Sequence, residues 1–249
     1  MSPVRPRTVA VWRMVRATAH VVHGLWIIRT RFDRQSPEQT EATVAQWSRD
    51  MLRIMGVRLE VCGPAPSGSC LVVANHISWL DILVINAAQP VRFVSKADVL
   101  RWPLLGRLVA GAGTLFIERE SRRDAVRMVQ IMAERLQAGD RVAVFPEGTT
   151  GDGRSLLPFH PNLLQSAIAA DAPIVPVALR YVRANSQERH DAPVFVGNTT
   201  LVASIWTTLR ARELTAVVLY NEAQTADGRD RRAWAQDLHN ALNRHVCCP

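Results

Sequence analysis

Residues 74–81 read Ala74-Asn75-His76-Ile77-Ser78-Trp79-Leu80-Asp81, and the fold that we expect follows from this stretch. The apolar run 71–74 before it predicts a short buried strand, and the apolar periodic segment 82–88 after it predicts a helix. His76 would then lie where a strand ends and a helix begins, which is where α/β folds place their ligands.

His76 and Asp81 are candidate catalytic residues. A histidine titrates near neutral pH and can take a proton from an alcohol, while a nearby carboxylate can fix its tautomer and stabilise the imidazolium. A structural interpretation also fits, because Ser78 followed by Asp81 resembles a capping box with Asp in place of Glu or Gln. For an isolated H-x-x-x-x-D pattern the structural interpretation is the better one, so the choice depends on the other motifs.

The composition is that of a globular protein with a high positive charge. The chain has 249 residues, enough for one large core, with 48% hydrophobic and 21% charged residues. A formal net charge of +8 and a pI near 10.5 indicate a polyanionic partner: anionic lipid, a phosphorylated substrate, an acidic carrier protein or nucleic acid. The cysteines show no zinc spacing and no C-x-x-C pair, so we expect reduced thiols and no metal site. They are Cys62, Cys70, Cys247 and Cys248.

The segment 8–29 predicts an amphipathic helix. Its basic and titratable side chains fall on one helical face, namely Arg13, Arg16, His20 and His23. Its large apolar side chains supply much of the remaining surface, namely Trp12, Val15, Val22 and Trp26. The apolar run 17–28 is shorter than the ~20 residues that span a bilayer, and no small-residue cleavage site follows it. We expect this helix to lie in a membrane interface, with packing on the domain core as the alternative.

Strands and helices alternate along the rest of the chain. Ser36-Pro37-Glu38-Gln39 predicts a helix over 37–55 that ends at Gly56. Further helices are predicted at 102–111, 122–137, 162–170 and 228–246. Strands are predicted at 57–61, 71–74, 91–95, 114–117, 142–145, 174–179, 194–196 and 216–220. Pro176 indicates that the strand 174–179 lies at a sheet edge or contains a bulge. The alternation predicts an α/β fold with a mixed, largely parallel sheet flanked by helices.

Two further strand ends carry groups that suit an anion. Phe145-Pro146-Glu147-Gly148-Thr149 turns from a strand into a glycine-rich loop, whose backbone N–H groups and hydroxyl suit a phosphate or an oxyanion. The segment 113–119 places Arg119 at another strand end, where its guanidinium could bind a phosphate with two hydrogen bonds. Each segment alone also fits an ordinary turn or a surface arginine.

Four segments in this order resemble the four motif blocks of the glycerolipid acyltransferase family, which includes the 1-acyl-sn-glycerol-3-phosphate acyltransferases. They are Asn75-His76 with Asp81, 113–119, 145–149 and 174–177. Lys96, Pro103 and Gly106 also look like the stretch that follows the first block in that family. The resemblance covers about residues 70–180, and the flanking segments match only in character.

The resemblance implies a fold and a reaction. It implies a membrane-associated helical segment over 1–56, on the cytoplasmic face of the inner membrane, and an acyltransferase catalytic domain over 57–249. The reaction would transfer a fatty acyl group from an acyl carrier protein or coenzyme A thioester to a lysophospholipid hydroxyl, with no cofactor. Of the possible acceptors, the resemblance favours 1-acyl-sn-glycerol-3-phosphate, whose acylation would give phosphatidate.

The resemblance also assigns roles to residues. His76 would be the general base that deprotonates the acceptor, and Asp81 would orient it. Arg119 would bind the acceptor phosphate. The remaining site residues are Glu147, Gly148 and Thr149 for substrate binding, with Asn75 and Lys96 in support.

Two departures from the family pattern concern the acceptor. Many phosphatidate-forming members carry Phe-Lys-x-Gly after the third block, where this chain has Phe159-His160-Pro161-Asn162. The third block continues over 150–153 as Thr-Gly-Asp-Gly rather than Arg-Ser. Both features look closer to members that acylate other acceptors, including lyso-ornithine lipid.

Two other classes of protein are alternatives. One is a His/Asp hydrolase of thioesters or lipid esters, in which water replaces the acceptor hydroxyl. The other is a non-enzymatic module that binds membranes or nucleic acid. The sequence has no basic low-complexity tract and no RNA-binding signature with interleaved aromatic residues, so we expect no nucleic-acid partner.

Overall fold

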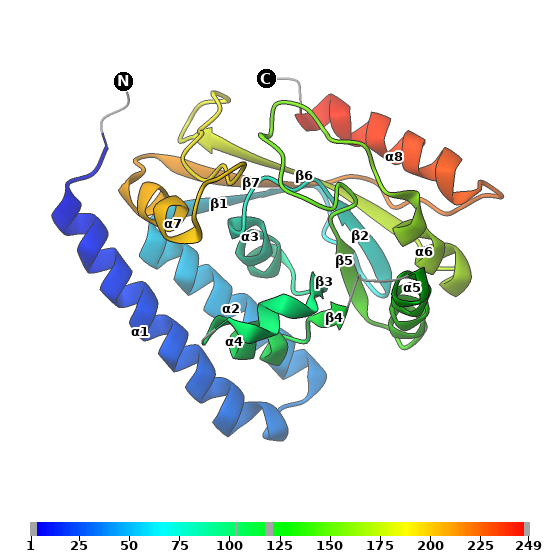
Figure 1. Ribbon diagram of the computed structural model, residues 1–249, viewed down its shortest axis with the longest axis horizontal. Coiled ribbons are helices and arrows are strands. Elements are labelled where there is room, and N and C mark those ends of the chain that lie inside the picture. Colours follow the sequence, from blue (N-terminus) through cyan, green and yellow to red (C-terminus); the bar gives the residue numbers. More distant parts are fainter. Residues whose placement is uncertain (1–3, 103, 118–121, 247–249) are drawn as a thin grey trace.

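A mixed sheet of seven strands forms the centre of the molecule (Figure 1). The computed structural model describes residues 4–102, 104–117 and 122–246. The strands are β1 (Val57–Cys62), β2 (Cys70–Ala74), β3 (Arg92–Lys96), β4 (Leu115–Ile117), β5 (Arg141–Val144), β6 (Ile174–Arg183) and β7 (Leu214–Tyr220). Their order is β1-β7-β6-β2-β5-β3-β4. All neighbouring strands run parallel except β6 and β7, which are antiparallel, so the predicted mixed, largely parallel sheet is confirmed.

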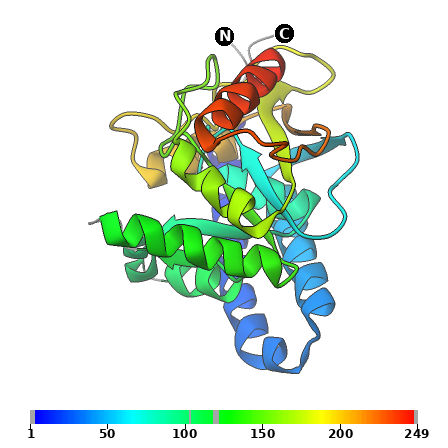
Figure 2. The same cartoon turned by 90° about the vertical axis from the view of Figure 1, so that its right-hand side faces the viewer.

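Helices cover both faces of this sheet (Figures 1 and 2). The helices are α1 (Arg7–Arg31), α2 (Pro37–Met55), α3 (Leu80–Ala88), α4 (Leu105–Gly111), α5 (Arg122–Gln137), α6 (Gln165–Ala170), α7 (Leu201–Arg210) and α8 (Arg231–Val246). Short 3-10 turns lie at Phe32–Arg34, Ala97–Arg101 and Pro161–Leu164. One buried cluster joins the sheet to α2, α3 and α7, and a second joins it to α5, α6 and α8.

Strand β2 lies near the middle of the sheet and is buried on both faces. Val72 and Ala74 belong to the cluster on the α2 and α3 side, whereas Leu71 and Val73 belong to the cluster on the α5 and α8 side. Side chains alternate between the two faces of a strand, so an unbroken apolar run is expected for a strand that is covered twice. This burial fixes the end of β2, and therefore the position of His76.

The local signals around α2 are confirmed. The Ser36 hydroxyl accepts a hydrogen bond from the Gln39 backbone N–H, and the Gln39 side chain accepts one from the Ser36 N–H, which is a capping box. Gly56 ends the helix with φ of 76°, a left-handed conformation that favours glycine. The closing helix is also confirmed as α8, with Trp234, Leu238 and Leu242 buried.

Of the two alternatives predicted for Pro176, the edge strand is wrong and the bulge is confirmed. Strand β6 lies between β7 and β2, in the interior of the sheet. The Pro176 carbonyl accepts a hydrogen bond from the Asn221 N–H, one residue beyond the end of β7 at Tyr220. A hydrogen-bonded antiparallel pair would also need an N–H from residue 176. Proline therefore costs the sheet one bond. Pairing resumes at Ile174 and Gln224, which exchange two backbone hydrogen bonds, with one extra residue on the Gln224 side, as in a bulge.

Two other predicted elements differ in the structure, and one helix was not predicted. The segment 194–196 is a loop rather than a strand, in which the Phe195 N–H donates to the Ile77 carbonyl instead of joining the sheet. The helix expected from residue 102 begins at Leu105 as α4, and Pro103 lies outside the described residues. Helix α7 was not predicted, although the Thr200 side chain caps it by accepting from the Ala203 N–H.

Helix α1 packs with part of its polar face toward the protein. The Arg13 guanidinium donates to the Leu209 carbonyl at the end of α7. The His20 ring stacks on Trp47 of α2 and lies 2.9 Å from the Trp47 carbonyl oxygen. Five large apolar side chains of α1 remain more than half exposed, namely Val11, Trp12, Val15, Val22 and Trp26. Among the described residues, no helix has the length and apolar character needed to cross a bilayer.

Candidate active site

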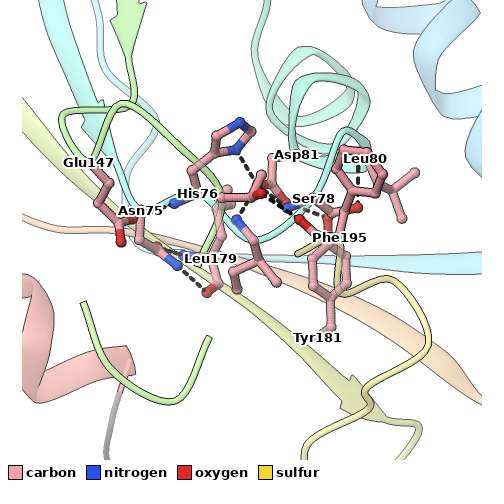
Figure 3. A network of polar contacts seen from close by, with 11 residues as sticks. Asn75, His76, Ser78, Leu80, Asp81, Glu147, Leu179, Tyr181 and Phe195 are labelled. Carbon is pink, nitrogen blue, oxygen red and sulfur yellow. Dashed lines mark hydrogen bonds and ion pairs between the residues drawn. The ribbon is translucent and has the colours of Figure 1, made fainter. Parts of the chain in front are cut away.

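The turn 75–79 carries His76 from the carboxyl end of β2 to the start of α3 (Figure 3). Asn75 fixes the first residue of this turn. Its side-chain amide donates to the Leu179 carbonyl at 3.1 Å and its oxygen accepts from the Leu179 N–H at 2.7 Å. The side chain of Asn75 thus continues the hydrogen bonding between β2 and β6 by one residue. Asn75 therefore supports the start of the turn, next to the histidine.

Asp81 lies beside His76 and is fully buried. Its Oδ2 lies 2.8 Å from His76 Nδ1 and also accepts hydrogen bonds from the backbone N–H groups of Ile77 and Ser78, at 2.7 and 2.9 Å. The structure fits both the structural and the catalytic interpretation of Asp81. The same carboxylate oxygen accepts hydrogen bonds from the backbone N–H groups of the turn before α3 and contacts the imidazole of His76. An ionised carboxylate accepts but does not donate, so the proton of a neutral His76 ring lies on Nδ1 and the lone pair on Nε2.

The His76 ring stacks on a second aromatic ring. The centroids of His76 and Phe145 are 3.9 Å apart, and the ring planes differ by 9°. The side chain of His76 is 19% exposed, so solvent or a substrate reaches it from one side. A small cavity of about 130 Å³ lies at this side. Its lining is largely apolar and comprises His76, Val94, Ser95, Val144, Phe145, Gly148 and Leu163.

Glu147 ties the third motif block to the catalytic turn. Its Oε1 accepts from the His76 backbone N–H at 2.7 Å (Figure 3). Its Oε2 accepts from the Leu157 N–H at 2.8 Å. Burial raises the pKa of this carboxyl, and the two backbone hydrogen bonds oppose that rise. The Gly151 N–H also donates to the His76 carbonyl at 2.7 Å. Both carboxylate oxygens of Glu147 are therefore bonded within the protein, and one of them holds the backbone of His76.

Of the other predicted substrate-binding residues, Gly148 and Thr149 are both exposed. Gly148 lines the small cavity with φ of 70°, and a Cβ added there would lie 3.0 Å from the His160 ring. Thr149 is exposed beside it. Arg119 and the side chain of Lys96 lie outside the described part of the chain. The structure thus brings His76, Asp81, Asn75, Glu147 and Gly148 together around one turn.

Sequence reasoning missed two contacts of this site. Tyr181 of β6 donates its hydroxyl to Asp81 Oδ1 at 2.6 Å, across 100 residues of sequence. The Trp79 ring N–H donates to the Ser204 hydroxyl of α7 at 3.0 Å. Neither partner belongs to a motif, and no local pattern relates them to His76. Only the arrangement of β6 and α7 around the turn reveals them.

The site thus places a histidine at a strand end, where it lines a small, largely apolar cavity and contacts a buried carboxylate. The Acyltransferase family model matches residues 56–180 of this chain. The 1-acyl-sn-glycerol-3-phosphate acyltransferase of Neisseria meningitidis serogroup B is 35% identical over 227 residues, covering 88% of each chain. The lyso-ornithine lipid O-acyltransferase of Pseudomonas aeruginosa is 37% identical over 196 residues, covering 79% of this chain and 75% of that protein.

A solved structure shows the same fold. The crystal structure of the 1-acyl-sn-glycerophosphate (LPA) acyltransferase from Thermotoga maritima superposes with a TM-score of 0.70 at 18% identity, covering 96% of this chain and 93% of that one. With the family match and the relatives, the conclusion is plain: the chain belongs to the acyltransferase family. The family that the four motif blocks predicted is confirmed, and the protein is an acyltransferase.

Proposed function

We propose that this enzyme transfers a fatty acyl group from a thioester to the free hydroxyl of a lysophospholipid, with His76 as the general base. His76 Nε2 takes the hydroxyl proton while the acceptor oxygen attacks the thioester carbonyl carbon. The carbon–sulfur bond then breaks, and the leaving thiolate takes the proton from the imidazolium. The observation that supports this role is the 2.8 Å contact between His76 Nδ1 and buried Asp81, which leaves Nε2 as the basic nitrogen.

The attack is direct, so the mechanism forms no acyl-enzyme. The sequence contains no G-x-S-x-G nucleophile elbow that would support one. The donor is a thioester of acyl carrier protein or coenzyme A, and the reaction uses no cofactor beyond this co-substrate. Asp81 stabilises the imidazolium that forms during the transfer, because its charge is buried and close to the ring.

The acceptor that we favour is 1-acyl-sn-glycerol-3-phosphate, which gives phosphatidate. The Neisseria relative that carries this activity in its name aligns over more of the chain than the Pseudomonas lyso-ornithine lipid acyltransferase does. The second candidate is lyso-ornithine lipid, which the sequence Phe159-His160 favours because it lacks the lysine of many phosphatidate-forming members. His160 lies beside Gly148 at the small cavity, close enough to affect the choice of headgroup.

An acceptor panel tests this proposal. Purified protein is given lysophosphatidate, lyso-ornithine lipid or lysophosphatidylglycerol, each with acyl carrier protein and coenzyme A thioesters, and acylated lipid and free fatty acid are both quantified. Acylated lipid from lysophosphatidate supports the proposal. Release of fatty acid without acylated lipid would identify a hydrolase instead, and transfer to lyso-ornithine lipid alone would identify the second acceptor.

Arg119 is the residue that we propose as the phosphate ligand. Replacing Arg119 with alanine should raise KM for lysophosphatidate by roughly 10- to 100-fold, because a charge-assisted bidentate contact contributes about 1.5–3 kcal/mol. KM for zwitterionic lyso-ornithine lipid should change much less. Arg123→Ala, an exposed arginine four residues away, is the matched control. An equal rise in KM for both acceptors in Arg119→Ala would contradict the role of Arg119 as the phosphate ligand.

The proposal includes a membrane surface as partner. The exposed apolar side chains of α1 form one row with arginines beside it: the Arg16 guanidinium carbon lies 4.5 Å from the Trp12 ring centre, and that of Arg31 lies 5.3 Å from the Trp26 ring. Tryptophan and arginine together suit the boundary between acyl chains and headgroups. The net charge of +8 suits an anionic leaflet, so the enzyme lies on the cytoplasmic face of the inner membrane.

The exposed face of α1 gives a test of membrane binding. The triple variant Trp12→Ser, Val15→Ser, Trp26→Ser should sediment with phosphatidylglycerol vesicles at least about tenfold less well, because each buried apolar side chain contributes about 1.5–3 kcal/mol. These side chains are 51–63% exposed, so the fold should persist. Val126→Ser on α5, across the sheet, is the control because Val126 is 59% exposed. Equal sedimentation of the triple variant and the wild type would contradict the interfacial position of α1.

A further inference from the structure

Tyr181 contacts the catalytic carboxylate from the side opposite the histidine. It lies on β6, is 3% exposed, and donates its hydroxyl to Asp81 Oδ1 at 2.6 Å (Figure 3). His76 Nδ1 and the two backbone N–H groups of the turn all contact the other oxygen, Oδ2. The two oxygens therefore have different partners: Oδ2 contacts the imidazole and the turn, and Oδ1 contacts the tyrosine.

This division has a geometric consequence. Three donors hold Oδ2, but a carboxylate held at one oxygen only can still rotate about that oxygen, and this rotation would change the direction of its contact with the imidazole. The Tyr181 hydroxyl fixes the second oxygen and prevents that rotation. The bond is short, as expected for a hydroxyl that donates to an ionised acceptor.

The Tyr181 hydroxyl remains a donor over the working pH range. Burial raises the pKa of Tyr181 well above its ordinary value, and the charge of Asp81 raises it further. A hydroxyl that keeps its proton presents the positive end of its dipole to the carboxylate. That dipole partly neutralises the negative potential that Asp81 exerts on the imidazole.

Tyr181 also separates the buried carboxylate from a large cavity. The cavity has a volume of about 410 Å³ and is lined by Tyr181 together with charged or titratable side chains. These are Asp152, Arg154, Arg180, Glu188, Arg189 and His190. On the other side of the pair, Glu147 is the charged group that contacts the turn, through the His76 backbone N–H. Removal of the tyrosine hydroxyl alone leaves all of these groups and the ring in place.

We propose that Tyr181 is a positioning residue that holds the Asp81 carboxylate against His76 and tunes the strength of the base through it. The inference rests on the proposed acyl transfer, in which His76 Nε2 takes the acceptor proton. No motif of the chain contains Tyr181, and it does not line the small cavity at His76, so its effect on the reaction passes through Asp81.

The variant Tyr181→Phe isolates the hydroxyl. We expect kcat to fall roughly tenfold, because a hydrogen bond to a charged group is lost and the carboxylate is less constrained. We expect KM for both substrates to stay within about twofold, because the acceptor and donor are not contacted. The acidic limb of the pH–rate profile should move to higher pH, since the imidazolium is more stable beside a carboxylate that has lost its donor.

Tyr220→Phe is the matched control, since the chain has two tyrosines and both are buried. Tyr220 lies on the neighbouring strand β7, is 4% exposed, and its hydroxyl finds no hydrogen-bond partner among the described residues. It should leave kcat and the pH–rate profile unchanged. The acidic limb decides the matter: a shift in Tyr181→Phe and none in Tyr220→Phe supports the inference, and an unshifted limb in Tyr181→Phe overturns it. If the wild type transfers no acyl group at all, the proposed function fails instead.

Discussion

A His76→Ala variant is expected to lose acyl transfer by a factor of roughly 10²–10⁴ or more, because the reaction then lacks its positioned general base. The acceptor hydroxyl is a weak nucleophile until its proton leaves, and in the proposed mechanism the His76 imidazole, which lines the small cavity, takes that proton. The backbone of residue 76 keeps its bonds to Glu147 and Gly151, so the turn should persist. Single-turnover transfer to lysophosphatidate measures the loss, and thermal unfolding checks the fold.

His76→Gln refines this experiment. A glutamine amide can donate to Asp81 much as the imidazole does, but it cannot take a proton near neutral pH. It should therefore be as inactive as alanine while restoring the contact with Asp81. His245→Ala near the end of α8 is the control. Transfer at the wild-type rate in either His76 variant would refute the proposed mechanism.

The second large effect is expected from Asp81→Asn, at roughly 10²–10³-fold in kcat. The new amide can place its oxygen or its NH2 group at the Oδ2 position. Two backbone N–H groups, of Ile77 and Ser78, already donate there, so the oxygen is favoured and the NH2 group faces the Tyr181 hydroxyl. The His76 tautomer is then kept, and the variant loses the charge together with the hydrogen bond that Tyr181 donates to Oδ1. Opposite charges about 4 Å apart interact by about 4 kcal/mol at an effective dielectric constant of about 20.

Two comparisons test this argument. Asp81→Ala should also lower stability, because the N–H groups of the turn lose their buried acceptor, whereas Asp81→Asn should largely keep it. Asp50→Asn on α2, where Asp50 pairs with Arg53 at the surface, is the control and should change neither quantity. Full activity of Asp81→Asn would show that the charge of Asp81 does not assist the transfer.

Local signals made much of the fold predictable. Helix α2 carries its cap, its first-turn proline and its terminal glycine within 20 residues, and each acts over one turn of helix. The buried strand β2 and the pair His76 and Asp81 are similarly local, because five residues separate the histidine from its carboxylate. Patterns of this range are visible in the sequence without knowledge of the sheet.

Features that depend on distant partners were not predictable. Whether Pro176 sits in an edge or an interior strand depends on the strands that pair with β6, and those come from other parts of the chain. The segment 194–196 resembles a strand, but its partner is the Ile77 carbonyl of the catalytic turn. The bonds of Glu147 to His76 and of Tyr181 to Asp81 cross 71 and 100 residues, respectively. The roles of these two side chains therefore emerge only from the fold.

The backbone of His76 is held on both sides by one loop. Its N–H donates a hydrogen bond to the Glu147 carboxylate, and its carbonyl accepts one from the Gly151 N–H. An acceptor headgroup that pulled this loop outward would stretch both hydrogen bonds and displace the imidazole. A headgroup that pressed the loop inward would hold the imidazole in place. Binding of a headgroup at this loop would therefore be coupled to the position of the imidazole, and such coupling is reciprocal. A lysolipid with the wrong headgroup would be rejected by misalignment of the chemistry as well as by weak binding.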